Sequence, residues 1–555
     1  MSTKLKLFSL FMLFLFILSA CTGPAEETPV AETAPESVEQ AETQEAILRV
    51  GWSSEPDTMN PLTTYSTEAT EVLNLIYDKL ISYDRDFKAQ PGLAEEFSYS
   101  EDGLSIIFTL RDNAKWQDGE PVTVDDVVFT FNLIKENELG SFAQYLLNLT
   151  EVTTSDEKTV VLSFDQPQAF NPALATPILP KHIWEEMSAE DIELFANAQP
   201  IGSGPYKFID WQEGSLLSLE RNDDFWGDLP AADKIIFVLY GNEDVMAQAL
   251  KGGDIDIITE IPPTIWDGLQ NVDNVKAVSL PSYSFHHIGF NVSEDANSLG
   301  NPLLLDKTVR QALNYAIDRN QLVQVALAGH GRPGVSILPI GLVDWYLDIP
   351  EDEQMDADPE KAQEMLEAAG YVDTDGDGVR EDANGNPLEF RLIVIESTSV
   401  DVRAAQLFRD AAEVVGIKLD LLTMDENTLG NLVYNIDAPD WDIFVWGWDS
   451  GIDPNEMLGV PLCSQIGGNN DNFYCNEAYD ALYDQQSTTI DFSARKEIVD
   501  EMQRIFYEDA SYIVMWYQNK LQGYRTDTWQ GWKEIAGGLV YNITRDNYLM
   551  VEPVK

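Results

Sequence analysis

Hydrophobic and polar positions alternate between strand-like and helix-like spacing most clearly in residues 388–446. Short apolar runs rich in β-branched residues are typical of buried strands, and the stretches between them have apolar residues at helical spacing. The expected order is strand 388–395, helix 401–415, strand 417–422, helix 426–434 and strand 441–446. Because β-α-β crossovers are right-handed, we expect the three strands to be parallel.

Ligands of open parallel sheets bind beyond the carboxyl ends of the strands. In this unit the rule selects the loops that follow Ile395 and Val445. The polar and aromatic candidates in these loops are Ser397, Thr398, Trp446, Trp448, Asp449 and Asp453. For the two tryptophans, packing inside the domain is the alternative to contact with a ligand.

A second α/β unit is expected at residues 234–258, and a region of different texture at 85–185. The second unit has strand 234–240, helix 242–251 and strand 255–258, and further amphipathic helices are expected at 306–319 and 358–370. The region 85–185 combines strand-like runs at 105–110 and 159–164 with a helix at 124–135. The pattern therefore predicts an α/β protein with a mixed α+β insertion.

The N-terminus has the form of a bacterial export signal. Residues 1–20 contain two lysines, then an apolar run too short for a stable membrane span, then small residues before Cys21. This ending resembles a lipobox, in which Cys21 is acylated and becomes the first residue of the mature chain. The alternative is an ordinary signal peptide with a chance cysteine. Residues 21–46 are rich in Glu, Ala, Thr and Pro, which predicts a disordered, lipidated tether.

Composition limits the function classes. The 555 residues are 44% hydrophobic, enough for two or three domains, and the net charge of −61 makes nucleic acid an unexpected partner. The charge favours solubility in a salty or extracellular medium, with an acidic cation-binding face as the alternative.

Two cysteines remain once Cys21 is assigned to lipid. Cys463 and Cys475 lie in an exported chain, so we expect a disulfide that closes a Gly/Asn-rich surface loop. A reactive thiol pair is the alternative.

Several short blocks occur in an order that resembles one family. The blocks are 108–111, 115–127, 202–206, 249–256, 289–291, 309–313, 316–318 and 368–371. Together they are similar to solute-binding protein family 5, the extracellular receptors of peptide, nickel and oligosaccharide ABC importers. The resemblance covers nearly the whole mature chain and implies a periplasmic-binding-protein-like fold, with two ligand-clamping α/β lobes and an inserted third lobe.

The resemblance also implies a division into lobes and a mode of action. Lobe I would combine residues 47–84, 186–285 and 515–555, lobe II would be the insertion 85–185, and lobe III would be 286–514. Lobes I and III would close over a small ligand by a hinge motion. We expect a lipid-anchored, exported monomer that passes its ligand, a dipeptide or oligopeptide, to the membrane permease subunits of an ABC importer.

In peptide-binding members of the family, an aspartate shortly after a Gly-Trp pair anchors the ligand's α-amino group. Here Gly451 stands about where that aspartate is expected, so Asp449 or Asp453 takes its place, or the ligand lacks a free amine. The resemblance further places Tyr65, Tyr283 and Trp516 facing the cleft. The alternative for these three aromatic residues is burial in the core.

An acidic segment at residues 373–378 has part of the spacing of a calcium loop. Asp373, Asp375 and Asp377 are spaced as ligands, but Asn384 stands at position twelve instead of the bidentate glutamate. An acidic hairpin turn is the favoured interpretation, with a structural calcium as the alternative. We expect no other cofactor.

Three alternatives to a peptide receptor stay open. An oligosaccharide, or another solute such as a nickel chelate, would suit the same family, and the 13 tryptophans favour a sugar. A secreted hydrolase using two carboxylates is a different class, although the sequence has neither a G-x-S-x-G nor an H-E-x-x-H motif. A calcium-dependent adhesion protein is a weaker option.

Overall fold

The computed structural model describes residues 45–540 and 544–555. The expected signal peptide 1–20, lipidation at Cys21 and all but the last two residues of the expected tether lie outside the described residues. Among the helices that are described, none has both the length and the apolar character needed to cross a bilayer.

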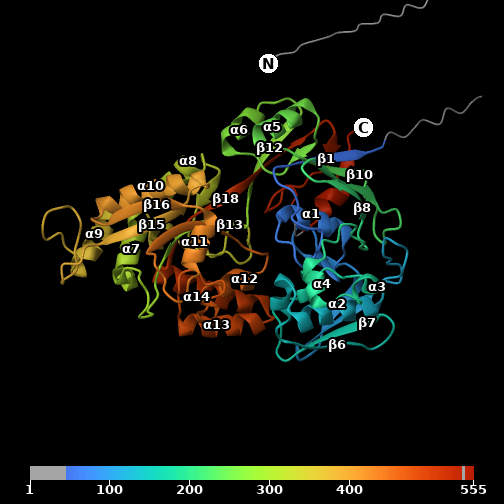
Figure 1. The fold of residues 1–555 in the computed structure, drawn as a ribbon, viewed down its shortest axis with the longest axis horizontal. Coiled ribbons are helices and arrows are strands. Elements are labelled where there is room, and N and C mark those ends of the chain that lie inside the picture. Colours follow the sequence, from blue (N-terminus) through green and yellow to red (C-terminus); the bar gives the residue numbers. More distant parts are fainter. Residues whose placement is uncertain (1–44, 541–543) are drawn as a thin grey trace, which may run out of the picture. The chain divides into compact units, whose positions relative to one another are not determined.

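A twelve-stranded mixed sheet runs through the structure (Figure 1). Its path has the order β16-β15-β17-β13-β18-β11-β1-β10-β9-β8, and β12 and β14 pair with β18 beside this path. The strands are β1 (Ile47–Trp52), β8 (Tyr206–Gln212), β9 (Leu216–Arg221), β10 (Lys234–Leu239), β11 (Ile257–Ile258), β12 (Val275–Pro281), β13 (Ser284–Phe290), β14 (Gly331–Pro333), β15 (Glu389–Ile395), β16 (Lys418–Met424), β17 (Ile443–Asp449) and β18 (Tyr512–Arg525).

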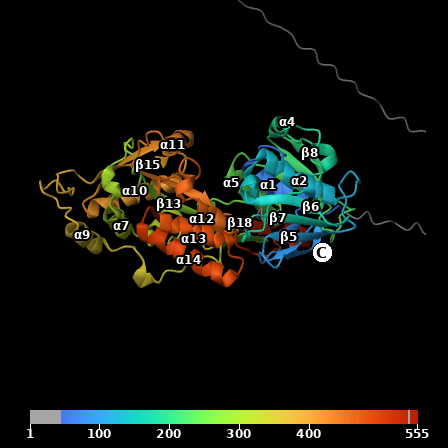
Figure 2. The same ribbon diagram turned by 90° about the horizontal axis from the view of Figure 1, so that it is seen from below.

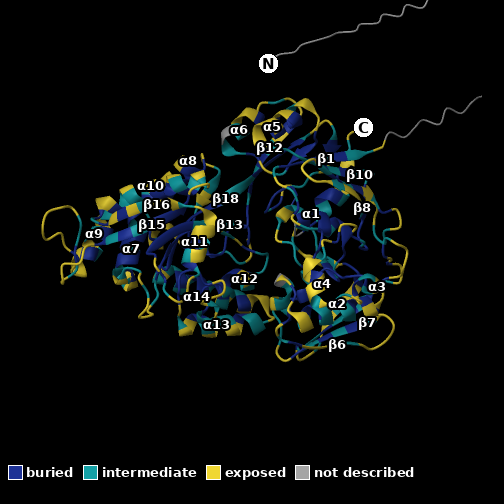
Figure 3. Ribbon diagram, viewed as in Figure 1, coloured by how far each residue is buried: buried dark blue, intermediate teal, exposed yellow. Residues whose placement is uncertain are grey.

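The predicted β-α-β-α-β unit is confirmed. β15 pairs in parallel with β16 on one side and with β17 on the other. The connections are α10 (Ser399–Val414) and α11 (Glu426–Val433), whose buried faces pack against these strands. β15 is largely buried, as Figure 3 shows, because it lies inside the sheet and helices cover it. β16, at the edge of the sheet, keeps most of its side chains exposed or half-buried.

The second predicted α/β unit is also present. β1 lies between β10 and β11 and is parallel to both. α5 (Glu243–Gly252) begins after Asn242, whose side chain accepts a hydrogen bond from the Val245 amide, and ends at Gly253 in the left-handed conformation.

The helix expected at 306–319 is present but ends earlier than expected. α7 (Lys307–Ala316) ends at Ile317, which is extended, and α8 (Arg319–Ala326) begins after Asp318. The Asp318 side chain caps α8 by accepting the Gln321 amide, so the chain starts a new helix directly after the expected one instead of extending it to residue 319.

The insertion has its own antiparallel sheet, in the order β4-β5-β7-β6. These strands are β4 (Ala94–Tyr99), β5 (Ser105–Leu110), β6 (Leu149–Thr154) and β7 (Thr159–Phe164), with α2 (Val124–Asn137) beside them. One hydrophobic cluster contains buried residues of this sheet and of β1, β9 and β10, so the insertion shares a core with the second α/β unit. The exact lobe boundaries stay a prediction.

β18 joins the two α/β units through a continuous backbone. Its first residues pair with β13, and its last seven pair with β12 in antiparallel register. The middle of the strand pairs with β14. The two halves of the large sheet are therefore connected by hydrogen bonds to one strand of 14 residues.

Helices cover the sheets and form a separate layer near β18. The remaining helices are α1 (Thr67–Ile76), α3 (Lys181–Trp184), α4 (Ala189–Leu194), α6 (Pro263–Leu269), α9 (Pro359–Ala368), α12 (Pro454–Gly459), α13 (Glu477–Thr488), α14 (Phe492–Asp509) and α15 (Asp546–Met550), and two short hairpin strands are β2 (Ile81–Tyr83) and β3 (Ala89–Pro91). Figure 2 shows α12, α13 and α14 side by side, in agreement with their contacts.

A glycine-containing segment positions α1. The backbone at Gly202-Ser203-Gly204 crosses the C-terminal end of α1, where the Gly204 amide donates to the Ile76 carbonyl at 2.8 Å. A Cβ at Gly202 would lie 2.0 Å from the same carbonyl oxygen, so only glycine permits this approach.

The guanidinium of Arg310 connects α7 to the chain that leaves α14. It is 6% exposed and donates to the backbone carbonyls of Leu304, Leu305, Asp509 and Ala510 at 2.7–3.2 Å. Four backbone carbonyls, two of them in buried hydrogen bonds, therefore depend on one side chain.

We expect Arg310→Met to lower the free energy of unfolding by about 3 kcal/mol, because it leaves buried carbonyls without donors. Urea denaturation measures the change. Arg409→Met, which removes a half-exposed arginine paired with its neighbour Asp410, is the control and should change the stability by less than about 1 kcal/mol. Equal effects of the two substitutions would contradict this role of Arg310.

Candidate ligand-binding site

A cavity of about 540 Å³ lies where the carboxyl ends of several strands meet. It is lined by Trp52 at the end of β1, Thr259 after β11 and Asp449 at the end of β17. α1 and the N-terminal part of α12 contribute further walls. This size is within the range of small-molecule sites, and the position is the one expected for ligands of parallel sheets.

Charges of both signs and many aromatic rings line the cavity. The acidic residues are Glu68, Glu71, Glu260, Asp449, Asp453 and Glu456, and the basic residues are Lys79 and Lys520. The aromatic residues are Trp52, Tyr83, Phe142, Tyr145, Phe170 and Tyr283. The wall can therefore contact apolar groups while charged side chains bind groups of opposite charge.

The two predicted aspartates have different surroundings. Asp453 forms a bidentate ion pair with Arg495, with N–O distances of 2.6 and 2.8 Å, and caps α12 by accepting the Asn455 amide. Asp449 is exposed to the cavity, and its carboxylate accepts a hydrogen bond from the Ser284 hydroxyl. Asp449 therefore has free capacity to accept a ligand donor, whereas Asp453 holds the local structure.

Sequence reasoning missed Glu456, which supplies a further carboxylate beside Gly451. A Cβ added at Gly451 would lie 2.2 Å from Glu456 Oε2, so the glycine leaves room for this carboxylate. Water reaches the Glu456 side chain, but the surrounding protein reduces its solvation and raises its pKa, against a hydrogen bond from Tyr145. The sequence feature that could have indicated Glu456 is Gly451, which stands where the family's aspartate is expected.

Glu71 of α1 is a second residue that sequence reasoning missed. Its side chain is buried, accepts hydrogen bonds from the Trp52 indole at 3.0 Å and from the Tyr548 hydroxyl, and still lines the cavity. Burial raises the pKa of Glu71 to about 7, although both hydrogen bonds oppose the shift. The carboxyl group is therefore partly protonated near neutral pH.

Of the three aromatic residues expected to face the cleft, one lines the cavity. Tyr283 lines it, whereas Tyr65 is 90% exposed and projects into solvent beyond its wall. Trp516 is fully buried and stacks on His286, which places it in the core. Ser397 is exposed after β15 and is not part of the wall, because only the β17 end of this unit reaches the cavity.

Trp446 and Trp448 pack within the protein and do not line the cavity. They are two residues apart in β17, so both side chains lie on one face of the strand. Both indole N–H groups donate to Asp471 Oδ2, at 2.9 and 3.0 Å. The structure therefore places both side chains as the packing alternative describes, outside the cavity wall, and their contact with a ligand stays a prediction.

Asp471 is the centre of a buried polar cluster. It is fully buried, and besides the two indoles it accepts a hydrogen bond from the Tyr512 hydroxyl. Tyr512 stacks on His287 with ring centroids 4.0 Å apart. His287 Nε2 lies 3.6 Å from Asp471 Oδ2, which is too long for a hydrogen bond, and neither ring nitrogen has a hydrogen-bond partner within the described residues.

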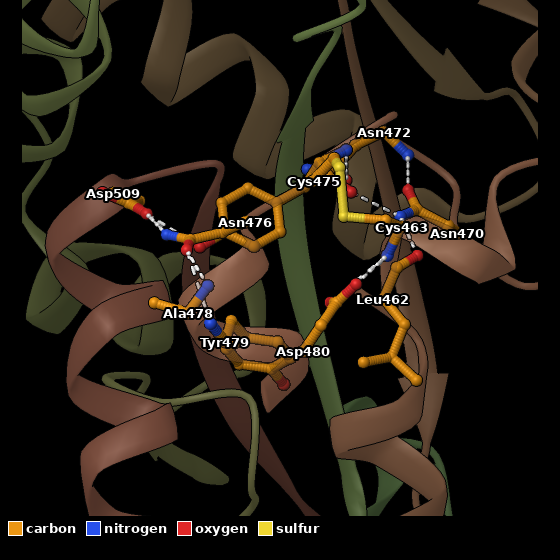
Figure 4. Close-up of a disulfide and its surroundings, with 11 residues drawn as sticks. Leu462, Cys463, Asn470, Asn472, Cys475, Asn476, Ala478, Tyr479, Asp480 and Asp509 are labelled. Carbon is orange, nitrogen blue, oxygen red and sulfur yellow. Dashed lines mark hydrogen bonds between the residues drawn. A yellow bond between two sulfur atoms is a disulfide. The ribbon is translucent and has the colours of Figure 1, made fainter. Parts of the chain in front are cut away.

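The disulfide that the sequence predicts is present and closes the loop that carries Asp471 (Figure 4). The Asn470 side chain crosses the loop and donates to the carbonyls of Leu462 and Tyr474 at 3.0 and 2.8 Å. This loop is therefore an ordered, partly buried structure that presents Asp471 to β17.

Comparison with known proteins decides the family. A model of the bacterial extracellular solute-binding proteins, family 5, middle region, matches residues 88–469. The chain is a member of this family. The fold expected from the resemblance is confirmed by solved structures that match nearly the whole chain.

Relatives of this family-5 protein include peptide receptors. The oligopeptide-binding protein AppA of Bacillus subtilis is 30% identical in an alignment of 547 positions that covers 94% of this chain and 96% of AppA. A solved structure of AppA in complex with a nonapeptide has a TM-score of 0.75 at 26% identity and covers 92% of this chain and 99% of that one. The mannohexaose-bound periplasmic oligopeptide-binding protein of Thermotoga maritima shares the fold, with a TM-score of 0.72 at 23% identity over 92% and 99%.

The acidic segment of this family-5 chain forms a compact turn. Asp373 accepts the amides of Gly376 and Gly378, as expected for an acidic hairpin turn. Ligand atoms of Asp373, Asp375, Asp377 and Glu381 also lie within 4.8 Å of one another. The calcium-loop pattern did not identify Glu381, because it expects the last carboxylate ligand at position 384. Calcium binding here stays a prediction.

Burial lowers the pKa of His287, against the charge of nearby Asp471. In the unfolded chain, His287 binds a proton near pH 6.5, whereas in the folded protein the buried ring stays neutral at that pH. The free energy of unfolding therefore decreases as the pH falls below about 6.5. His286, Asp401 and Tyr512 are the other titratable groups around the ring.

We expect His287→Phe to reduce the acid-side slope of the unfolding free energy, by up to about 1.4 kcal/mol per pH unit. Denaturation curves between pH 7 and pH 5 measure the slopes, and the difference from the unsubstituted protein removes the contribution of the other groups. His182→Phe, at an exposed histidine, is the control. Identical slopes for the His287 variant and the unsubstituted protein would contradict the assignment.

Proposed function

We propose that this family-5 protein captures a small peptide in the cavity and delivers it to an ABC importer. The observation that carries the proposal is the presence of both acidic and basic side chains in one partly apolar cavity. A free peptide has an ammonium group, a carboxylate and side chains of mixed polarity. Each group finds a partner of suitable chemistry in this wall.

The acidic end of the site suits the ligand's α-amino group. Asp449 and Glu456 offer carboxylate oxygens to an ammonium, and hydrogen bonds to charged groups in a shielded cleft contribute about 1.5–3 kcal/mol each. The relationship to AppA supports a peptide as the ligand, since that relative binds oligopeptides.

The mode of action follows from where the wall residues originate. Asp449 and Glu456 belong to the proposed lobe III, whereas Glu71 and Lys79 belong to the proposed lobe I. A ligand that contacts both lobes stabilises the closed state, because neither lobe alone provides all contacts. We propose an exported monomer, anchored by lipid on Cys21, that presents the closed complex to the permease subunits.

We propose binding without chemical conversion of the ligand. The family consists of solute-binding proteins, and two carboxylates of the cavity are held by structural partners, Asp453 by Arg495 and Glu71 by Trp52. Consumption of a peptide or glycan by the purified protein would favour the hydrolase alternative.

An oligosaccharide is the second candidate. Six aromatic side chains line the cavity, and aromatic planes suit the apolar faces of sugar rings. A neutral sugar leaves the charged side chains without ionic partners, which makes it the less favoured ligand.

We expect a pooled tetrapeptide library to stabilise the purified protein, and a panel of neutral oligosaccharides to have no effect. Binding only to the folded state adds about 2.7 kcal/mol when the free ligand is at one hundred times its Kd. Thermal-shift measurements with both panels, and native mass spectrometry of ligand that copurifies, provide the test.

Asp449→Asn should weaken peptide binding about tenfold or more, because it removes the charge that pairs with the ammonium. Asp437→Asn, at an exposed aspartate outside the cavity, is the matched control and should bind normally. Stabilisation by sugars and not by peptides would overturn the peptide assignment.

A further inference from the structure

Two lysines line the cavity, and they differ in their partners. The Lys520 ammonium lies 3.9 Å from a Glu260 carboxylate oxygen. The Lys79 ammonium forms neither a hydrogen bond nor an ion pair with any residue in 45–540 or 544–555. Each acidic residue of the wall accepts a hydrogen bond or forms an ion pair, so among the charged side chains of the wall Lys79 is the one with no hydrogen-bond or ion-pair partner in the described residues.

The backbone directs Lys79 toward the cavity. Lys79 forms an antiparallel bridge with Pro177, another residue of the wall. Successive side chains of an extended segment point to opposite sides. Asp78 points away into the core, where it is 1% exposed and accepts hydrogen bonds from Ser203, Trp226 and Arg545. The carboxylate of Asp78 therefore points away from the Lys79 ammonium and does not form an ion pair with it.

An ammonium that has lost much of its water needs an anionic partner. Burial lowers the pKa of Lys79 to about 8, and the positive charge of Arg545 adds to the effect. Most of the side chain is still protonated at pH 7, so the cavity contains a cation whose lost hydration is not replaced by protein. An anionic ligand group at this point would restore the missing interaction.

We propose that Lys79 binds the terminal carboxylate of the ligand and makes this receptor selective for peptides with a free C-terminus. This inference rests on the proposed peptide function. The amino group then pairs with the acids of β17 and α12, while the carboxylate pairs with the segment that follows α1. One zwitterionic ligand thereby neutralises groups from both proposed lobes, which gives it a contact that a neutral sugar or an amidated peptide lacks.

The test compares one pooled tetrapeptide library in two forms, as free acids and as C-terminal amides, which differ in the terminal negative charge. Isothermal titration at pH 7 measures the affinity of both forms for the unsubstituted protein and for Lys79→Met. We expect the unsubstituted protein to prefer the acids by about tenfold or more, and Lys79→Met to bind acids and amides about equally.

The amide form is also the folding control, because its binding to Lys79→Met should be nearly unchanged. Lys79→Arg should keep the preference for acids, and Lys88→Met, at an exposed lysine outside the cavity, should behave like the unsubstituted protein. A preference for acids that persists in Lys79→Met, or no preference in the unsubstituted protein, overturns the role of Lys79 while peptide binding stands. Failure of both library forms to bind the unsubstituted protein overturns the peptide function itself and this inference with it.

Discussion

The buried carboxylate of Asp471 is the interaction on which the geometry of the ligand site depends. It accepts hydrogen bonds from Trp446 and Trp448 of β17 and from Tyr512 of β18, and so joins the strand that ends at the cavity to the strand shared by both units. A buried carboxylate is stable only while its donors are present. The disulfide holds the loop that carries Asp471, and the next residue of β17 after Trp448 is Asp449 at the cavity wall.

The second constraint is the continuity of β18. Because this strand pairs with β13 in one part and with β12 in the other, the two α/β units are connected through a hydrogen-bonded backbone. The cavity forms beside that connection, where the carboxyl ends of β1, β11 and β17 contribute to one wall. Ligand binding between units linked in this way can couple to closure, since each unit supplies only part of the charge pattern.

The fold was predictable to the extent that it is encoded locally. Each predicted unit combines apolar strands with a helix between consecutive strands, and both units are present with parallel pairing. In one unit the strand 388–395 pairs in parallel with its neighbour, and in the other the strand 234–240 does. The end of the helix expected at 306–319 was placed too late, because Asp318 caps a new helix directly after it. The signal and lipidation site lie outside the described residues, so they stay predictions.

Only those site residues that lie in the loop after one predicted strand could be predicted from the sequence. The rule for parallel strands selected Asp449, but the tryptophans beside it face Asp471, a partner 25 and 23 residues further along the chain. Glu71 and Lys79 reach the same cavity from segments more than 360 residues before Asp449, a distance in sequence that local patterns do not bridge. A crystal structure of the protein with a bound tetrapeptide tests the central claim most directly. The account predicts the peptide inside this cavity, with its amino group on Asp449 or Glu456 and its carboxylate on Lys79; a peptide bound elsewhere, or one that leaves these side chains without contact, would contradict it.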